Sequence, residues 1–139
     1  MNATTIQKYS KKSTPQLVKL ATKPFNSYIR NRDREMEFYT CIACGETKRI
    51  FSNDYQASHF YSAGNYLALR FNEDNVHGGC KKCNYFLSGN LIEYRHNLVK
   101  KIGEKGVKDL DNKAALNKRQ IFKWDRFFLI EIIEEYKNK

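Results

Sequence analysis

Two Cys-x-x-Cys pairs constrain the fold of this chain more than any other feature. They are Cys41/Cys44 and Cys80/Cys83, and they contain all four cysteines of the sequence. Two residues between a pair of cysteines let both thiolates point at one ion from a single tight turn, and two such turns complete a tetrahedron around zinc. We therefore expect one structural Zn²⁺ bound by four thiolates. Two disulfides are the weaker alternative, because we expect the chain in a reduced cytosol.

The spacing between the two pairs indicates that more than a zinc ribbon is built here. Thirty-five residues separate Cys44 from Cys80, whereas a compact ribbon usually has about 15 to 20. The chain has 139 residues, the size of one domain. It has no apolar run of 18 residues, and its first residues lack the apolar middle of a signal peptide. We therefore expect a cytoplasmic protein with no membrane partner.

Basic residues outnumber acidic ones and are unevenly placed. The chain has 25 Lys and Arg against 15 Asp and Glu, a net charge of +10. Residues 1–23 hold five lysines and no acid, and residues 81–119 hold ten basic residues against four acidic ones. Such a surface attracts polyanions, of which nucleic acid is the commonest. The alternative is a solvated lysine-rich surface that binds nothing.

Apolar spacing and turn residues predict three segments along the chain. Residues 1–23 are expected to form a basic, flexible arm or a loosely held first helix. The folded core is expected over residues 24–103, opening at Pro24 with a helix of about three turns. Residues 104–139 are expected to form a helical extension that packs on the core or on a dimer partner.

Within these segments, alternation and capping residues predict individual elements. Residues 49–61 and 65–71 are rich in β-branched and aromatic residues and are predicted as short strands. A helix is predicted over residues 91–102, with Gly103 as its stop. A last helix is predicted after Asp125, its N-cap, and the apolar stripe of this helix comprises Phe128, Leu129, Ile132, Ile133 and Tyr136.

Three polar residues surround the cysteine pairs. His59 lies between the pairs, Asn75 lies five residues before Cys80, and Asn84 directly follows Cys83. A lone histidine is more often a surface or hydrogen-bonded core residue than a catalyst, and we keep that interpretation for His77 and His96. His59 differs because of these neighbours.

The pattern N-x4-C-x-x-C-N, preceded by a histidine at a strand end, resembles the HNH (ββα-metal) nucleases of the four-cysteine type. The segments YIRNRD, CIACG, ASHF, residues 69–103 and the closing W-D-x-x-F-x-L-x-x-I-I-x-x-Y look like the phage NinG/Rap recombination proteins. This resemblance runs from about Phe25 to Tyr136 and is most specific over residues 70–95.

The resemblance implies an α+β fold: a zinc-stabilised, treble-clef-like ββα-metal core with flanking helices. It implies a structure-specific endodeoxyribonuclease of phage recombination, which cuts branched DNA such as Holliday junctions or D-loops in the bacterial host cell. In that family pattern His59 is the general base, Asn75 braces the loop, and Asn84 binds the catalytic metal. A homodimer is attractive, because symmetric resolution of a four-way junction needs two active sites.

The chemistry of phosphodiester cleavage requires the same kinds of group, independently of the family resemblance. A neutral histidine can take a proton from water, and Mg²⁺ or Mn²⁺ can stabilise the developing charge. Zinc saturated by four thiolates has no open position, so its role would be to hold the strand of His59 against the helix of Asn84. Many HNH enzymes carry a metal ligand directly before the base, where this chain has Ser58. Gln56 and His77 are two further candidate ligands.

For contact with DNA we nominate the basic residues nearest to this pattern, each of which could instead belong to a solvated basic face. They are Arg70, Lys81, Lys82, Arg95, Lys100 and Lys101. Two other function classes stay open: a non-catalytic zinc-finger protein that binds DNA or RNA, and an interaction module that uses the C-terminal apolar stripe.

Overall fold

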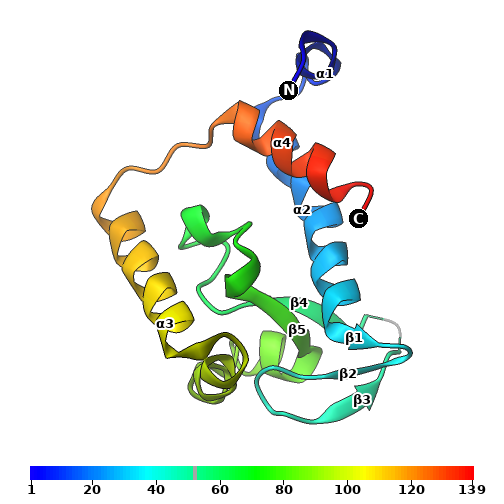
Figure 1. The fold of residues 1–139 in the computed structure, drawn as a ribbon, viewed down its shortest axis with the longest axis vertical. Coiled ribbons are helices and arrows are strands. Elements are labelled where there is room, and N and C mark those ends of the chain that lie inside the picture. Colours follow the sequence, from blue (N-terminus) through cyan, green and yellow to red (C-terminus); the bar gives the residue numbers. More distant parts are fainter. Residues whose placement is uncertain (52) are drawn as a thin grey trace. The chain divides into compact units, whose positions relative to one another are not determined.

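The computed structural model describes residues 1–51 and 53–139. Helices and two small antiparallel sheets make up the chain (Figure 1), so the predicted α+β class is confirmed. The chain forms two compact units, one of Met1–Tyr28 with Lys123–Lys139 and one of Ile29–Phe122. The predicted boundaries after residues 23 and 103 stay predictions.

The first unit contains α1 (Ala3–Lys8), the first part of α2 (Thr14–Asp33) and α4 (Arg126–Tyr136). Aromatic rings join α2 and α4: the Tyr136 ring lies 5.0 Å from that of Phe25 and 5.1 Å from that of Tyr28. Figure 1 shows α4 alongside α2. No helix among the described residues has the length and apolar character needed to cross a membrane.

The helix predicted to open at Pro24 begins ten residues earlier. Helix α2 begins at Thr14 and contains Pro24, so most of the expected arm is helical in the structure. Apolar residues at helical spacing, Leu17, Ala21 and Phe25, continue through the proline and are fully buried. Burial of this stripe outweighs the one backbone hydrogen bond that a proline removes from a helix.

The C-terminal helix was predicted correctly. The Asp125 carboxylate accepts a hydrogen bond from the Phe127 backbone N–H at 2.9 Å and caps α4. The predicted stripe is buried except for Phe128, which is 41% exposed.

The second unit holds the end of α2 and the remaining elements. A three-stranded antiparallel sheet has the order β1-β2-β3, and a two-stranded antiparallel sheet pairs β4 with β5. The elements are β1 (Arg34–Glu35), β2 (Phe38–Thr40), β3 (Thr47–Arg49), β4 (Tyr55–His59), the 3₁₀ turns η1 (Leu67–Leu69) and η2 (Glu73–Asn75), β5 (Val76–Cys80), the π-helical turn η3 (Lys82–Phe86) and α3 (Leu91–Arg119).

One sequence prediction in this unit needs correction. The segment 65–71, predicted as a strand, instead contains the 3₁₀ turn η1. Gly103 breaks the helix as predicted, with φ 83° and ψ 163°, and helical structure then resumes, as expected for the residues after 103, and reaches Arg119. Without a Cβ, glycine adopts this conformation at little cost, so α3 kinks there and does not end.

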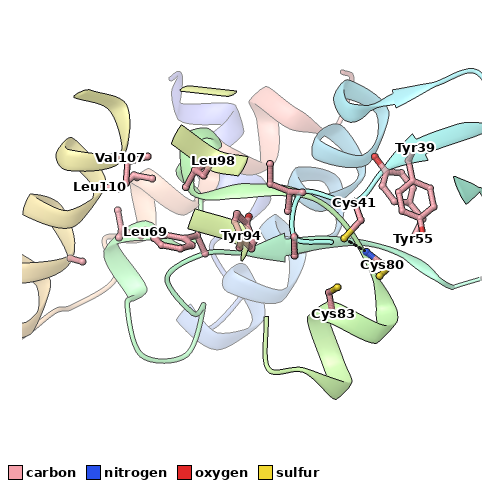
Figure 2. Packing of buried hydrophobic residues seen from close by; sticks show 14 residues of the cluster. Tyr39, Cys41, Tyr55, Leu69, Cys80, Cys83, Tyr94, Leu98, Val107 and Leu110 are labelled. Atoms are coloured by element: carbon pink, nitrogen blue, oxygen red, sulfur yellow. Dashed lines mark hydrogen bonds between the residues drawn. The ribbon is translucent and has the colours of Figure 1, made fainter. Parts of the chain in front are cut away.

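The core of the second unit joins the cysteine region to α3. Tyr39 of β2 and Tyr55 of β4 stack with ring centroids 4.1 Å apart, and Tyr94 and Leu98 on α3 are fully buried. Figure 2 shows these residues in one cluster with Cys41, Cys80, Cys83, Leu69, Val107 and Leu110. Cys41, Cys80 and Cys83 are therefore part of the core that supports β4 and β5.

Candidate metal centre and active site

The four cysteines come together as their spacing predicted. Their Sγ atoms all lie within 4.8 Å of one another, and three of the four residues are buried. A tetrahedron of sulfurs about 2.3 Å from zinc has edges of roughly 3.8 Å, so these thiols can bind one ion with small movements. This donor set suits a structural zinc.

Local backbone structure places each thiol. Cys41 directly follows β2, and the Gly45 N–H donates to the Cys41 carbonyl at 2.9 Å to close the first turn. Gly45 has φ +76°, a conformation that glycine adopts without strain. Cys80 ends β5 and Cys83 lies in η3, so the second pair connects the β4–β5 sheet to the turn that follows it.

His59 lies at the end of β4 with its ring fixed by the backbone. Its Nε2 is 2.9 Å from the Arg70 carbonyl oxygen. A carbonyl can only accept, so Nε2 carries the proton and Nδ1 presents a lone pair. No other hydrogen bond reaches the His59 ring from the described residues. Burial lowers the pKa of His59, with a further contribution from the Arg70 charge, although the Arg70 carbonyl opposes the shift. The ring is therefore neutral near pH 7 and can accept a proton at Nδ1.

Asn75 is fully buried and uses its whole amide group. Its Oδ1 accepts from the Tyr61 N–H at 2.8 Å, and its Nδ2 donates to the carbonyls of Tyr61 and Leu69 at 2.9 and 3.1 Å. These contacts brace the loop between β4 and β5, which carries the carbonyl of Arg70.

Asn84 lies in η3 against the middle of β4. Its Oδ1 accepts from the Ser58 hydroxyl at 3.0 Å, and its Nδ2 donates to Gln56 Oε1 at 2.7 Å. Residues 56 and 58 share one face of the strand, because side chains alternate along it. The structure thus brings Asn84 to Ser58, which directly precedes the candidate base His59, and to Gln56, a further candidate metal ligand.

His77 occupies a different environment from His59. It is buried, its Nε2 donates to the Asp74 carbonyl at 2.7 Å, and its Nδ1 lies 3.1 Å from an Arg32 nitrogen. Burial, with the nearby charge of Lys101, lowers the pKa of His77 to about 4, so the ring is neutral. Because both ring nitrogens have partners, this placement gives no support to His77 as a metal ligand. The other histidine, His96, is exposed on α3.

Sequence reasoning missed a charged cluster at the end of α2. Arg32 donates to the carbonyls of Glu73 and Val76 at 2.9 and 2.8 Å, on either side of Asn75. It also pairs with Asp33, whose carboxylate accepts the Gly78 N–H at 2.8 Å. The cluster joins α2 to the loop and strand that hold the candidate site.

Charge and hydrogen bonding keep Asp33 ionised despite its burial. Burial raises the pKa of Asp33, but hydrogen bonds from Arg32 and the Gly78 N–H and the charge of Lys101 outweigh it and lower the pKa to about 2. The one sequence signal was the Arg-Asp pair in YIRNRD, which carried weight only through the family resemblance.

Two of the basic residues nominated for DNA contact are paired with carboxylates. Arg95 donates to both oxygens of Asp111, at 3.1 and 2.6 Å, and Asp111 also accepts from the Tyr61 hydroxyl. Lys101 lies 3.0 Å from Asp33. Both cations therefore contribute to internal contacts.

The other nominated cations differ in exposure. Lys82 and Lys100 are exposed and Lys81 is half-buried; within the described ranges none of the three has an acidic partner within 4 Å. The Arg70 guanidinium lies 5.9 Å from the centre of the Phe71 ring, and burial lowers its pKa. Arg70 also supplies the carbonyl that holds His59, so its backbone belongs to the site whatever its side chain contacts.

Fold and site together define a small α+β protein with four cysteines placed to bind one metal ion and a neutral histidine held by a backbone carbonyl. The family described as "Bacteriophage Lambda NinG protein" matches residues 1–139. The chain belongs to the NinG family.

Individual relatives agree with this assignment. Protein ninG of Escherichia phage lambda is 36% identical over 107 residues, which are 77% of this chain and 50% of that protein. Protein ninG of Escherichia phage 933W and that of Salmonella phage P22 are each 35% identical over 107 residues, with the same coverage. The chain spans about half the length of the curated relatives it matches. No solved structure matches the chain.

Proposed function

We propose that this chain is a metal-dependent endodeoxyribonuclease of phage recombination that cuts branched DNA, such as a Holliday junction or a D-loop, in the bacterial host. Its core would be the ββα-metal unit formed by β4, β5 and η3. One observation carries the proposal: the Arg70 carbonyl fixes the His59 ring at Nε2, which leaves Nδ1 to accept a proton.

The roles of the protein groups follow from their contacts. His59 would take a proton from the attacking water at Nδ1. Asn75 would keep the Arg70 carbonyl in place, since its side chain bonds to Tyr61 and to Leu69, the residue before Arg70. The four-cysteine centre would hold β5 and η3 together, so that Asn84 stays against β4. Small misplacements of such groups are expensive in rate, which is a physical reason for so rigid a frame.

The groups around Asn84 fit a hard divalent ion in part. Asn84, Ser58 and Gln56 offer neutral oxygens, which Mg²⁺ and Mn²⁺ accept. Mg²⁺ sites usually combine carboxylates with substrate phosphates; here the phosphate would have to supply the charge. An ion held by Asn84 and Ser58 would stabilise the charge that develops on the leaving oxygen.

A non-catalytic zinc protein that binds DNA or RNA is the second candidate. The observation in its favour is that Asn84, Ser58 and Gln56 satisfy one another and have no carboxylate partner in the described part of the chain. Under this interpretation the basic surface would bind nucleic acid, and His59 would be a structural residue.

Cleavage assays with matched histidine variants separate the two candidates. The purified protein is incubated with junction, flap and linear DNA, with and without Mg²⁺ or Mn²⁺. We expect metal-dependent cleavage of branched DNA that His59→Ala abolishes and His96→Ala leaves intact, with zinc content and circular dichroism unchanged in both. His96 is the control because it is exposed on α3. Junction binding without cleavage under any metal would reject the nuclease and favour the binding protein.

A second experiment, on the protein bound to a junction, reports on assembly. Two active sites are needed to cut a four-way junction symmetrically, and we propose that a homodimer supplies them. Sedimentation of the protein bound to a junction should then give two chains per junction. One chain per junction, with paired cuts, would contradict the dimer.

A further inference from the structure

An exposed aromatic pair directly follows Asn84. Tyr85 is 71% and Phe86 68% exposed, and the next residue, Leu87, is 47% exposed. The two rings contact edge to face, with centroids 5.0 Å apart and planes at 81°. Single scattered apolar residues are normal on a surface, whereas apolar side chains that lie side by side form a candidate interaction site.

The backbone holds this pair outward by a strained turn. Ser88, Gly89 and Asn90 all have positive φ, at 51°, 95° and 50°. For residues other than glycine this conformation is uncommon, and it persists only where the surrounding structure enforces it. Three consecutive residues of this kind indicate a turn with a fixed shape.

Contacts to the second cysteine pair enforce that shape. The Gly89 N–H donates to the Cys83 carbonyl at 2.8 Å, and the Asn90 amide lies 3.6 Å from the Cys83 sulfur. The Leu87 N–H donates to the Lys82 carbonyl at 2.9 Å, closing the π-helical turn that presents the aromatic pair. The exposed rings are therefore presented by a turn whose backbone is bonded to Cys83, one of the four candidate metal ligands.

Charge around the pair favours nucleic acid over an apolar protein partner. Lys81 and Lys82 precede it in the same turn, and within the described ranges neither has an acidic partner within 4 Å. The chain as a whole carries +10. Aromatic rings beside unpaired cations suit a base that stacks while its phosphates meet the lysines. In a continuous duplex both faces of each base pair are covered, whereas an open, unstacked branch point leaves one face of its terminal base pairs uncovered.

We propose that Tyr85 and Phe86 form a wedge that stacks on the base pairs exposed at the branch point of DNA and so selects branched over linear substrate. This inference rests on the proposed function, because it puts the branch point beside Asn84. Tyr85 and Phe86 would then select the substrate, while the neighbouring Asn84 would bind the metal.

Binding measurements test the wedge without relying on cleavage. In a His59→Ala background, affinities are measured for a four-way junction and for a linear duplex of the same sequence at one salt concentration. Tyr85→Ser/Phe86→Ser should weaken junction binding about tenfold or more, since stacking contributes on that order per base, and change duplex binding less than twofold. Ile121→Ser, at a residue 92% exposed, is the matched control and should change neither.

A fluorescent base reports the contact directly. With 2-aminopurine at the branch point, the wedge-intact protein should quench the fluorescence and the double serine variant should not. The conservative Tyr85→Phe/Phe86→Tyr variant keeps both rings and should restore quenching and selectivity. Zinc content and circular dichroism confirm that each variant is folded.

Several results would overturn the wedge: equal loss of binding to junction and duplex, unchanged junction affinity, or no junction preference in the starting protein. A change of oligomeric state with selectivity intact would also overturn it and assign the patch to a second copy of the chain. Selective junction binding by a protein that never cuts would reject the proposed nuclease and leave the wedge standing.

Discussion

His59 and His77 differ in what their ring nitrogens contact, although burial lowers the pKa of both. His77 has a carbonyl on one nitrogen and a guanidinium on the other, so it serves as a buried connector. His59 has a carbonyl on one nitrogen only. The lowered pKa is therefore common to both histidines, and what separates them is that His59 keeps Nδ1 without a hydrogen-bond partner among the described residues.

The pH dependence of cleavage should report His59 directly. Only the neutral ring can accept a proton, so the rate should rise as pH increases through the pKa of His59 and then level off. Burial lowers this pKa below its ordinary 6.5, so the midpoint of the rise should lie below that pH. Single-turnover rates on a junction across pH 5 to 8 would measure it. His96→Ala should keep the same profile, and a midpoint above 6.5 would assign control to another group.

The residue types at the site were predictable to different degrees. Cysteine spacing predicted the metal centre, because two residues between thiols are a local geometric requirement. The cluster of Arg32 with Val76 and His77 was not, since its members lie 44 and 45 residues apart in the chain and meet only in the fold. The contact of Asn84 with Ser58 was not predictable either, because the sequence showed only that Ser58 stands where many HNH enzymes have a metal ligand.

At the scale of elements, β5 is the strand on which the site depends. All five of its residues are buried, and it pairs with β4 so that His59 faces Val76 and Ser58 faces His77. Two glycines in this strand let other groups approach its backbone. A Cβ on Gly78 would lie 2.6 Å from the Tyr55 ring, and one on Gly79 would lie 3.1 Å from Ser58 Cβ.

Gly78→Ala should therefore destabilise the fold. The added methyl must push the Tyr55 ring, which stacks on Tyr39 and donates its hydroxyl to the Arg30 carbonyl. Overpacking of this kind lowers the free energy of unfolding by about 1–3 kcal/mol. Gly64→Ala is the matched control, because a Cβ there meets nothing within 4 Å. Urea unfolding followed by circular dichroism compares the two, and equal stability would contradict the close approach.

Sequence patterns predicted helices and strands where burial is periodic, and they were wrong where side chains fix a loop. Residues 65–71 have strand-like composition, but the Leu69 carbonyl accepts a hydrogen bond from the Asn75 amide and not from a neighbouring strand. Pro24 was a reasonable start signal, but a continuous buried stripe carried α2 through it. In both places buried contacts in the folded chain outweighed local propensity.

At the scale of the whole second unit, metal binding and folding should be one process. Cys41, Cys80 and Cys83 belong to the same buried cluster as Tyr94 and Leu98. Cys80→Ser should remove zinc and unfold this unit, because zinc-binding energy in such sites is largely folding energy. Metal analysis and circular dichroism would measure both. A folded Cys80→Ser protein without zinc would contradict a structural role for the metal.

The net charge of +10 makes a further prediction about the whole molecule. Junction affinity should fall steeply with salt, because each neutralised phosphate releases counterions. Lys82→Ala and Lys100→Ala remove exposed lysines with no acidic partner in the described ranges, so each should reduce the slope of log affinity against log salt by about one if that lysine contacts phosphate. Lys101→Ala should change the slope less, because Lys101 is already paired with Asp33 at 3.0 Å. Filter binding from 50 to 300 mM salt measures the slopes; a flat response in the unmutated protein would argue against DNA as its partner.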